Sequence, residues 1–274
     1  MLFKQRKSIK TIIDVPKIRR RSFLEKIPLD HALIQAVQHL KSHEFLVNPA
    51  GHNIYLFLTN FVQDLAQDYF DMPLNQLQIL DWGCGKGHVS YLLQKQGLQV
   101  ISCDVMNNSG DSAYGQTVPI IDTFGINIVP LTHPYQLPFN DNSMDIVLSF
   151  GVLEHVTNDL ASLQEIERIL KPNGLFFCFD LPYVLSWTQK IAHMRGNYYH
   201  DRLYSRKSIC QLLNLSGLSL LDFWHRQLLP KNSIRYVGYR FWETVDQVLT
   251  EYTPLRYFAT NIEFVAVKGL SKSE

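Results

Sequence analysis

The sequence predicts an α/β fold: a doubly wound, mostly parallel sheet with helices at its start. From residue 77 onward, short apolar runs alternate with stretches of helical periodicity, which is the pattern of βαβ units. Three glycines at alternate positions follow the first apolar run, and an aspartate follows the second. Because the carboxyl ends of parallel strands form one edge where ligands bind, we expect the functional site at that edge.

The composition is that of a globular chain, with 46% apolar and 19% charged residues in 274. No run of eighteen apolar residues is present, and the first residues lack the apolar stretch of a secretory signal. The four cysteines form no C-x-x-C pair, so we expect neither a zinc site nor a dense disulfide framework. These features predict a cytoplasmic protein.

Charge is concentrated at the start of the chain. Residues 1–21 carry a net charge of +7, which leaves −6 on the remaining residues because the total is +1. A nucleic-acid-binding protein normally carries its positive charge on the folded body, so a nucleic acid partner is disfavoured. We interpret residues 1–22 as a basic arm, either a solvated tail or a segment that contacts an anionic membrane surface, an RNA or an organelle import machinery.

Helical periodicity follows the arm in residues 23–73, where Leu33, Val37 and Leu40 mark one helix and Phe57, Phe61 and Leu65 another. Met72-Pro73 ends this segment. Strands are then predicted at 78–82, 98–103, 126–131, 144–149 and 174–180, with helices at 87–95 and 158–170. Two later strands are expected at 217–225 and 260–268, and the last can return antiparallel.

Residues 74–274 form the predicted ligand-binding domain, and two aromatic segments in it lie outside the minimal sheet. These segments are residues 182–204 and 226–258. They either cap a substrate pocket over the sheet or pack as a helical layer. The sequence leaves both interpretations open.

The glycine loop is the strongest signal for function. Its sequence, Asp-Trp-Gly-Cys-Gly-Lys-Gly at 81–87, follows an apolar strand, and glycine allows positive φ and close approach of a ligand to backbone N–H groups. The spacing differs from the dinucleotide and phosphate-loop patterns. Asp104 at the end of the second strand can accept hydrogen bonds from both ribose hydroxyls. Together these features predict a nucleoside ligand.

With these residues the chain resembles the class I S-adenosylmethionine-dependent methyltransferases. The loop at 81–87 is similar to their first motif, and Asp104 to their ribose-binding acid. Further similar segments are Leu-Pro-Phe at 137–139, the strand entry at 141–147, Val-Leu-Glu-His-Val at 152–156 and the turn at 170–175. The resemblance covers about residues 77–181.

The resemblance implies S-adenosylmethionine as the cofactor, bound by eight residues. These are Asp81, Gly83, Cys84, Gly85, Gly87, Asp104, Val105 and His133. In this arrangement Gly83 and Gly85 line the methionine moiety, and Asp81 binds its ammonium group. Asp104 binds the ribose and Val105 contacts the adenine. His133 departs from the family, which often has Asp there, so Thr132 or a backbone carbonyl is an alternative partner for adenine.

A sulfonium methyl donor is already activated, so transfer requires a positioned acceptor and no metal. A hydroxyl acceptor would also benefit from a base, and histidine titrates in the useful range. The candidates are His155, in the Glu-His pair after the fourth strand, and His200, beside Asp201. The alternative for His155 is a structural hydrogen bond, and for His200 an ordinary exposed position.

The leading hypothesis is a methyltransferase acting on a small molecule, more readily on oxygen than on nitrogen or carbon. Methylation of RNA or protein is the enzymatic alternative, favoured only by the basic arm. An alternative of another class is a non-catalytic protein that binds the nucleoside and acts through a partner. The sequence leaves the acceptor and the oligomeric state open.

Overall fold

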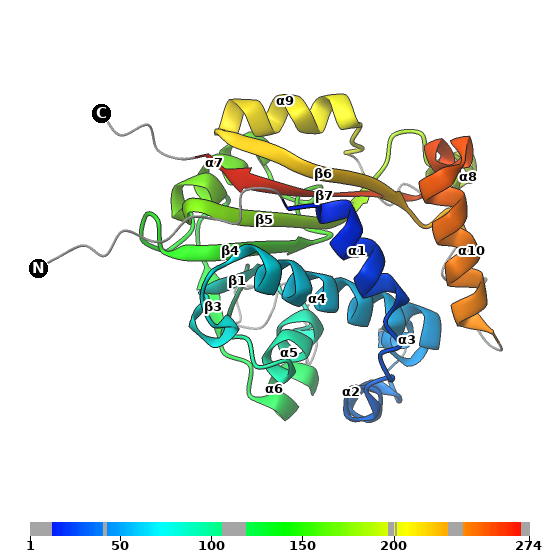
Figure 1. Cartoon of the computed structure of the whole chain (residues 1–274), viewed down its shortest axis with the longest axis horizontal. Coiled ribbons are helices and arrows are strands. Elements are labelled where there is room, and N and C mark those ends of the chain that lie inside the picture. The colour runs from blue at the N-terminus through cyan, green and yellow to red at the C-terminus, as the bar shows by residue number, and fades with distance from the viewer. Residues whose placement is uncertain are drawn as a thin grey trace, which may run out of the picture.

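The computed structural model describes residues 13–40, 43–105, 119–196, 200, 202–229 and 238–269. Its centre is a seven-stranded sheet with the order β3-β2-β1-β4-β5-β7-β6 (Figure 1). The strands are β1 (Ile79–Trp82), β2 (Val100–Val105), β3 (Ile128–Leu131), β4 (Met144–Phe150), β5 (Leu170–Pro182), β6 (Leu218–Arg226) and β7 (Asn261–Lys268). Each predicted strand is present within a few residues of its expected position.

Strand β7 is the one that runs against its neighbours. β1 pairs in parallel with β2 and β4, and the pairs β2–β3 and β4–β5 are also parallel. β7 is antiparallel to both β5 and β6. The predicted mostly parallel sheet, with an antiparallel return of the last strand, is therefore confirmed.

Helices cover both faces of the sheet (Figure 1). They are α1 (Val15–Leu24), α2 (His31–Val37), α3 (Glu44–Val47), α4 (Pro49–Tyr69), α5 (His88–Lys95), α6 (Pro119–Phe124), α7 (Asp159–Ile169), α8 (Trp187–Met194), α9 (Arg206–Ser216) and α10 (Tyr239–Tyr252). Two short 3₁₀ helices, η2 (Leu74–Gln76) and η4 (Pro254–Phe258), complete the described elements. None of the helices in the described ranges is long and apolar enough to cross a bilayer.

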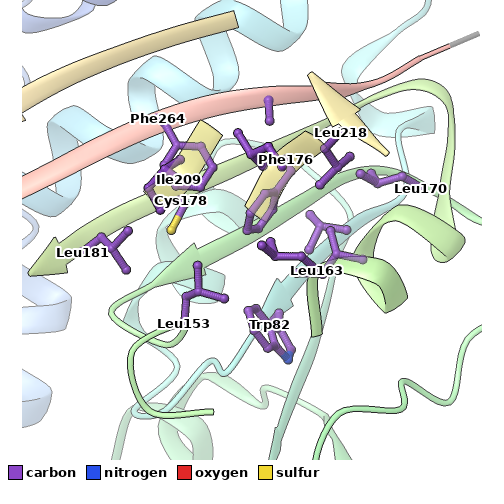
Figure 2. Packing of buried hydrophobic residues seen from close by; sticks show 14 of the residues in the cluster. Trp82, Leu153, Leu163, Leu170, Phe176, Cys178, Leu181, Ile209, Leu218 and Phe264 are labelled. Carbon is purple, nitrogen blue, oxygen red and sulfur yellow. The ribbon is translucent and has the colours of Figure 1, made fainter. Parts of the chain in front are cut away.

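The core lies on both sides of β5, because successive side chains of a strand point to opposite faces. Phe176 and Cys178 pack with residues of α7 and α9 on one face, including Leu163 and Ile209 (Figure 2). Phe177 on the other face packs in a second cluster with residues of α1 and α4. Strand β5 is therefore buried on both faces, and it supports the part of the sheet at which β1, β2 and β4 end.

The interpretation of the basic arm, residues 1–22, as a solvated tail is wrong for the part that the structure describes. Helix α1 begins at Val15 and buries Val15 and Ile18 against α4. Arg19 is also buried, and its guanidinium contacts carboxylate oxygens of Asp222 at 3.2 Å and Glu251 at 2.6 Å. One cation of the basic segment therefore stabilises the fold. Residues 1–12 lie outside the described ranges.

The helices of residues 23–73 approach the carboxyl edge of the sheet through α3. The turn between α3 and α4 is tight, because a Cβ on Gly51 would stand 2.1 Å from the carbonyl oxygen of Phe45. Leu46 of α3 packs in a third cluster with Leu92 of α5 and Ile120 of α6. This packing carries Phe45 to the edge where the first two strands end.

Candidate functional site

A cavity of about 560 Å³ lies beyond the carboxyl ends of β1, β2, β3 and β4. Its volume is typical of a small-molecule site. The wall includes seven of the eight residues expected at the cofactor: Asp81, Gly83, Cys84, Gly85, Asp104, Val105 and His133. Gly87 is not part of the wall. Seven of the expected residues therefore line one cavity at the carboxyl edge of the sheet.

The glycine loop takes the conformation that its sequence favours. Gly83 has φ +70°, and a Cβ there would stand 2.6 Å from a methyl group of Val152. Gly87 has φ +77°, precedes the first residue of α5 and donates its N–H to the carbonyl of Cys84 at 2.9 Å. Gly87 therefore sets the turn into α5, whereas the first two glycines face the cavity.

Asp104 links the second strand to the glycine loop. Its Oδ2 accepts the N–H of Gly85 at 2.6 Å and its Oδ1 accepts the N–H of Val105 at 2.7 Å. The side chain is buried, which raises the pKa of the carboxyl, and the two N–H donors oppose this shift. Each oxygen retains a lone pair for a ligand, because a carboxylate accepts about four hydrogen bonds.

Asp81 at the end of β1 is almost wholly buried on the wall of the cavity. Its Oδ2 accepts a hydrogen bond from the Ser90 hydroxyl at 2.6 Å, and that hydroxyl also lies 2.7 Å from the Ser102 hydroxyl. Burial raises the pKa of Asp81 to about 7, the Ser90 hydrogen bond lowers it, and the nearby Asp104 raises it. A cationic ligand group would favour the ionised carboxylate.

Val105 and His133 extend the cavity over β2 and β3. Val105 is 46% exposed, which is unusual for valine in a strand and leaves its side chain open to a ligand. The His133 Nδ1 accepts the backbone N–H of Gln136 at 3.0 Å, and the ring meets the Tyr135 ring edge to face at 4.6 Å. The His133 side chain thus stabilises the turn at residues 133–136 and also lines the cavity.

The two candidate bases, His155 and His200, lie side by side although 45 residues separate them in the sequence. Their ring centroids are 5.5 Å apart. The His155 side chain is 56% exposed and lines the cavity, whereas His200 is half-buried and is not on the wall. Asp201, expected to orient His200, lies outside the described residues.

Glu154 joins this pair. Its side chain is 2% exposed, and Oε1 lies 3.9 Å from the Nε2 of His155. Burial raises the pKa of Glu154 to about 8, and the charge of Asp180 adds to that shift. Within the described part of the chain, three side chains each place one possible ligand atom within 4.8 Å of the others: Glu154, His155 and His200. Such a group of carboxylate and imidazole donors could hold a divalent metal ion.

Arg202 and Tyr204 hold the loop that carries His155, and sequence reasoning gave them no such role. The Arg202 guanidinium donates to the Val156 carbonyl at 2.9 Å, and the Tyr204 hydroxyl donates to the Leu153 carbonyl at 3.1 Å. The loop is therefore fixed by residues just beyond His200. No spacing in the sequence connects these segments.

Phe45, Lys86 and His88 also line the wall of the cavity. The Lys86 ammonium lies 5.0 Å from the centre of the Phe45 ring, and burial lowers its pKa. The His88 ring meets the Phe45 ring at 5.5 Å and the Tyr55 ring at 4.4 Å. His88 begins α5, as expected for a helix-start residue, and its place on the wall is a new finding.

Neither aromatic segment contributes a described residue to the wall of this cavity. Segment 182–204 approaches it through His200 beside His155. Segment 226–258 instead borders a second, smaller cavity of about 60 Å³ with Arg19 and Trp224. The wall expected from these segments is supplied in part by Phe45 from the N-terminal helices.

Two family models match this region, both described as a methyltransferase domain, one over residues 80–178 and the other over 132–228. Together they include the glycine loop, Asp104 and the loop of His155. The sheet order and the cavity agree with these matches. The matched part of the chain, residues 80–228, is a methyltransferase domain, which indicates an S-adenosylmethionine-dependent enzyme.

Curated relatives share part of the chain. It is 32% identical over 134 residues to the human mitochondrial arginine-hydroxylase NDUFAF5, covering 47% of this chain and 36% of the relative. It is 28% identical over 148 residues to a ubiquinone biosynthesis O-methyltransferase of Rickettsia prowazekii, covering 48% and 56%. The matched region is thus less than two thirds of the length of either relative.

Solved structures share the fold at lower identity. A SAM-dependent methyltransferase from Thermotoga maritima superposes with a TM-score of 0.54 at 15% identity, covering 86% of this chain and 99% of that one. A SAM-dependent methyltransferase from Methanosarcina mazei gives 0.50 at 17% identity, covering 72% and 94%. Because fold alone does not select a substrate, the acceptor is inferred from the site.

Proposed function

We propose that the protein transfers a methyl group from S-adenosylmethionine to a hydroxyl oxygen of a small molecule. One observation carries this proposal: Asp104 over β2 and His155 over β4 face the same cavity. The carboxylate that we assign to the ribose and the imidazole that we assign as the base therefore border one space. The order of the strands separates them, because β1 lies between β2 and β4.

The end over β1, β2 and β3 fits the cofactor. The spare lone pairs of Asp104 suit two ribose hydroxyls, and the exposed Val105 side chain suits an adenine face. Asp81 suits the ammonium group of the methionine moiety, since ionisation of this buried carboxyl is favoured by a cation. The first two glycines of the loop admit the ligand close to the backbone.

The end over β4 fits the acceptor. When bound, the cofactor supplies an electrophilic methyl group that needs no further activation. We assign His155 to take the proton of the acceptor hydroxyl as the new oxygen–carbon bond replaces the carbon–sulfur bond of the donor, which would leave as the thioether, because the His155 ring is exposed on the wall. His200, 5.5 Å away and off the wall, is assigned to position His155.

Glu154 supports the same assignment. A buried carboxyl with a pKa near 8 carries little negative charge at neutral pH. The exposed imidazole of His155 thus lies beside a buried, largely uncharged acid. The buried acid and the exposed imidazole thus suit proton removal from a neutral acceptor.

The wall also limits the acceptor. Phe45 and Phe150 border this end of the cavity, so flat hydroxylated molecules would find apolar surface there. The relative from Rickettsia prowazekii is named as an O-methyltransferase, which supports oxygen as the target. The RNA alternative loses part of its basis, because Arg19 of the basic segment is paired inside the fold.

The test is transfer of a labelled methyl group from S-adenosylmethionine to a panel of phenols, catechols, aliphatic alcohols and amines. The proposal expects label in a hydroxylated aromatic compound with the wild-type chain and with the His39→Gln control, whose histidine is exposed on the surface. His155→Gln should lose the transfer. Label only in amines would contradict the proposal. Loss of transfer on chelation of metals would reassign Glu154, His155 and His200 to a metal site.

A further inference from the structure

A surface helix usually buries its apolar stripe and exposes its polar residues. Helix α10 has the opposite orientation. Its polar residues Glu243, Asp246 and Thr250 recur at helical spacing and face the body of the protein. Its aromatic residues face outward, with Phe241 64% and Tyr252 67% exposed. The helix therefore presents its apolar stripe to the surroundings.

The inward acids are anchored, so this orientation follows from named contacts. Glu243 accepts a hydrogen bond from the Asn53 side chain at 2.8 Å, and Glu251 accepts one from Arg19 at 2.6 Å. Asp246 accepts the backbone N–H groups of Gln227 at 3.2 Å and Leu229 at 2.6 Å. Rolling the helix to hide its apolar face would break these hydrogen bonds.

The exposed apolar side chains form one area, called here the α10 surface. On α10 and η4 it consists of Phe241, Trp242, Val248, Tyr252, Tyr257 and Phe258. The segment that leads from β5 into α8 approaches it, because the His225 ring lies 4.9 Å from Tyr183 and 5.8 Å from Tyr257. Val184, Leu185, Ile191 and Met194 around α8 are also exposed. Contiguous apolar area of this kind marks an interaction site.

Among the residues that the structure describes, the charged side chains beside the α10 surface are basic. Lys190 and Arg195 are exposed on or just after α8, and Arg240 and Arg256 flank the aromatic residues. Residues 183–196 contain no acid, and the acids of α10 face inward. A second copy docked on this face by a two-fold axis would bring like charges together, which disfavours a dimer. An anionic bilayer complements both the charge and the aromatic side chains.

We propose that the α10 surface docks on the interface of an anionic lipid bilayer. Trp, Tyr and Phe side chains are suited to that interface because their rings are apolar with, in Trp and Tyr, a polar tip. The docking is peripheral, since none of the described helices could span a membrane. Strands β5 and β6 both end opposite Asn261 of β7. Gln227, the residue after β6, donates its N–H to Asp246 of α10, so the α10 surface lies at the same carboxyl edge of the sheet as the cavity. Docking would hold that edge near the lipid.

The test is flotation of the full chain with vesicles of phosphatidylcholine alone or with phosphatidylglycerol. We expect binding to the anionic vesicles, and a loss of about tenfold or more in Trp242→Glu and in Tyr252→Glu, because a charge replaces an aromatic ring at the interface. Leu215→Glu is the matched control. Leu215 is 66% exposed on α9, just before the start of β6 at the opposite edge of the sheet.

Acyl chains that carry bromine give a second readout. They should quench the fluorescence of the wild-type chain, with much weaker quenching in Trp242→Phe. Equal flotation of Trp242→Glu and Leu215→Glu, or no flotation, would overturn the proposal, and equal flotation would place the contact elsewhere, for example in the basic arm. A dimer in sedimentation velocity that Trp242→Glu dissociates would assign this surface to a second copy.

Discussion

The half of the cavity over β1 and β2 is built from one stretch of chain, whereas the half over β4 is assembled from three. Residues 81–105 supply the glycine loop and Asp104 to the first half. Phe45 and His155 line the second half from the N-terminal helices and the loop after β4, and His200 from the segment after β5 lies beside His155, off the wall. The first half is thus a local motif, and the second depends on tertiary packing.

This difference predicts that the two halves can be damaged separately. A change over β2 should weaken cofactor binding, and a change over β4 should slow turnover with the cofactor still bound.

His155→Gln should lower kcat by about 10²–10³, because it removes a positioned base. Its dissociation constant for S-adenosylmethionine should remain within about twofold of the wild type, because His155 is assigned to the acceptor. Turnover kinetics and calorimetry measure the two quantities. His200→Gln should cost less, about tenfold in kcat, as expected for a positioning residue, and should shift the pH profile. If His155→Gln lost cofactor affinity by as large a factor as it lost kcat, the two halves of the cavity would not be functionally separate.

Asp104→Ala should weaken S-adenosylmethionine binding by about 100-fold, the loss expected for two hydrogen bonds to a charged acceptor. Thermal unfolding of the variant should remain cooperative, because Asp104 lies at a strand end and not in an apolar cluster. Calorimetry gives the affinity. Asp122→Ala, on α6, is a matched control that should bind as the wild type does. Unchanged affinity in Asp104→Ala would reject the ribose assignment.

Cofactor affinity should rise with pH through about 7, the pKa to which burial raises Asp81. Below that pH the carboxyl is protonated and must lose its proton before it pairs with the ligand ammonium; above it the carboxylate is already present. Affinity should therefore change by up to about tenfold per pH unit below the pKa. Calorimetry in two buffers of different ionisation enthalpy measures the released proton. Asp81→Asn should bind weakly at every pH, and a persistent pH dependence in that variant would exclude Asp81 as its source.

Arg202→Met should have the smallest effect, a few-fold loss of kcat. The substitution removes the donor to the Val156 carbonyl and loosens the loop of His155 by about 1–2 kcal/mol. Cofactor affinity should be unchanged. Arg206→Met is the control, because Arg206 is exposed at the start of α9. A loss of cofactor affinity in Arg202→Met would show that the loop serves both halves.

The same contrast explains what the sequence could predict. Asp81, the glycines and Asp104 were predicted together, because a strand, a loop and the next strand place them at fixed spacing. His155 and His200 were each proposed, yet their proximity depends on the packing of Arg202 and Tyr204 on the loop of His155. Phe45 was missed because it reaches the cavity through the packing of α3.

The sheet was predicted almost completely, and the surface helices less well. Apolar runs specify buried strands such as β5 without reference to other segments. Helix α10 has a strong helical period, but its sequence alone does not show which stripe faces inward. Distant partners, Asn53 and Arg19 among them, fix that choice. Arg19 similarly belongs to the fold because Asp222 and Glu251 are brought to it.

The most direct test of the central claim is titration calorimetry of the wild-type chain with S-adenosylmethionine and S-adenosylhomocysteine. We predict one site per chain for each ligand, with affinities in the micromolar range, and competition between the two. Failure of both ligands to bind would contradict the assignment of the cavity over β1 and β2 to the cofactor, and with it the proposed methyl transfer.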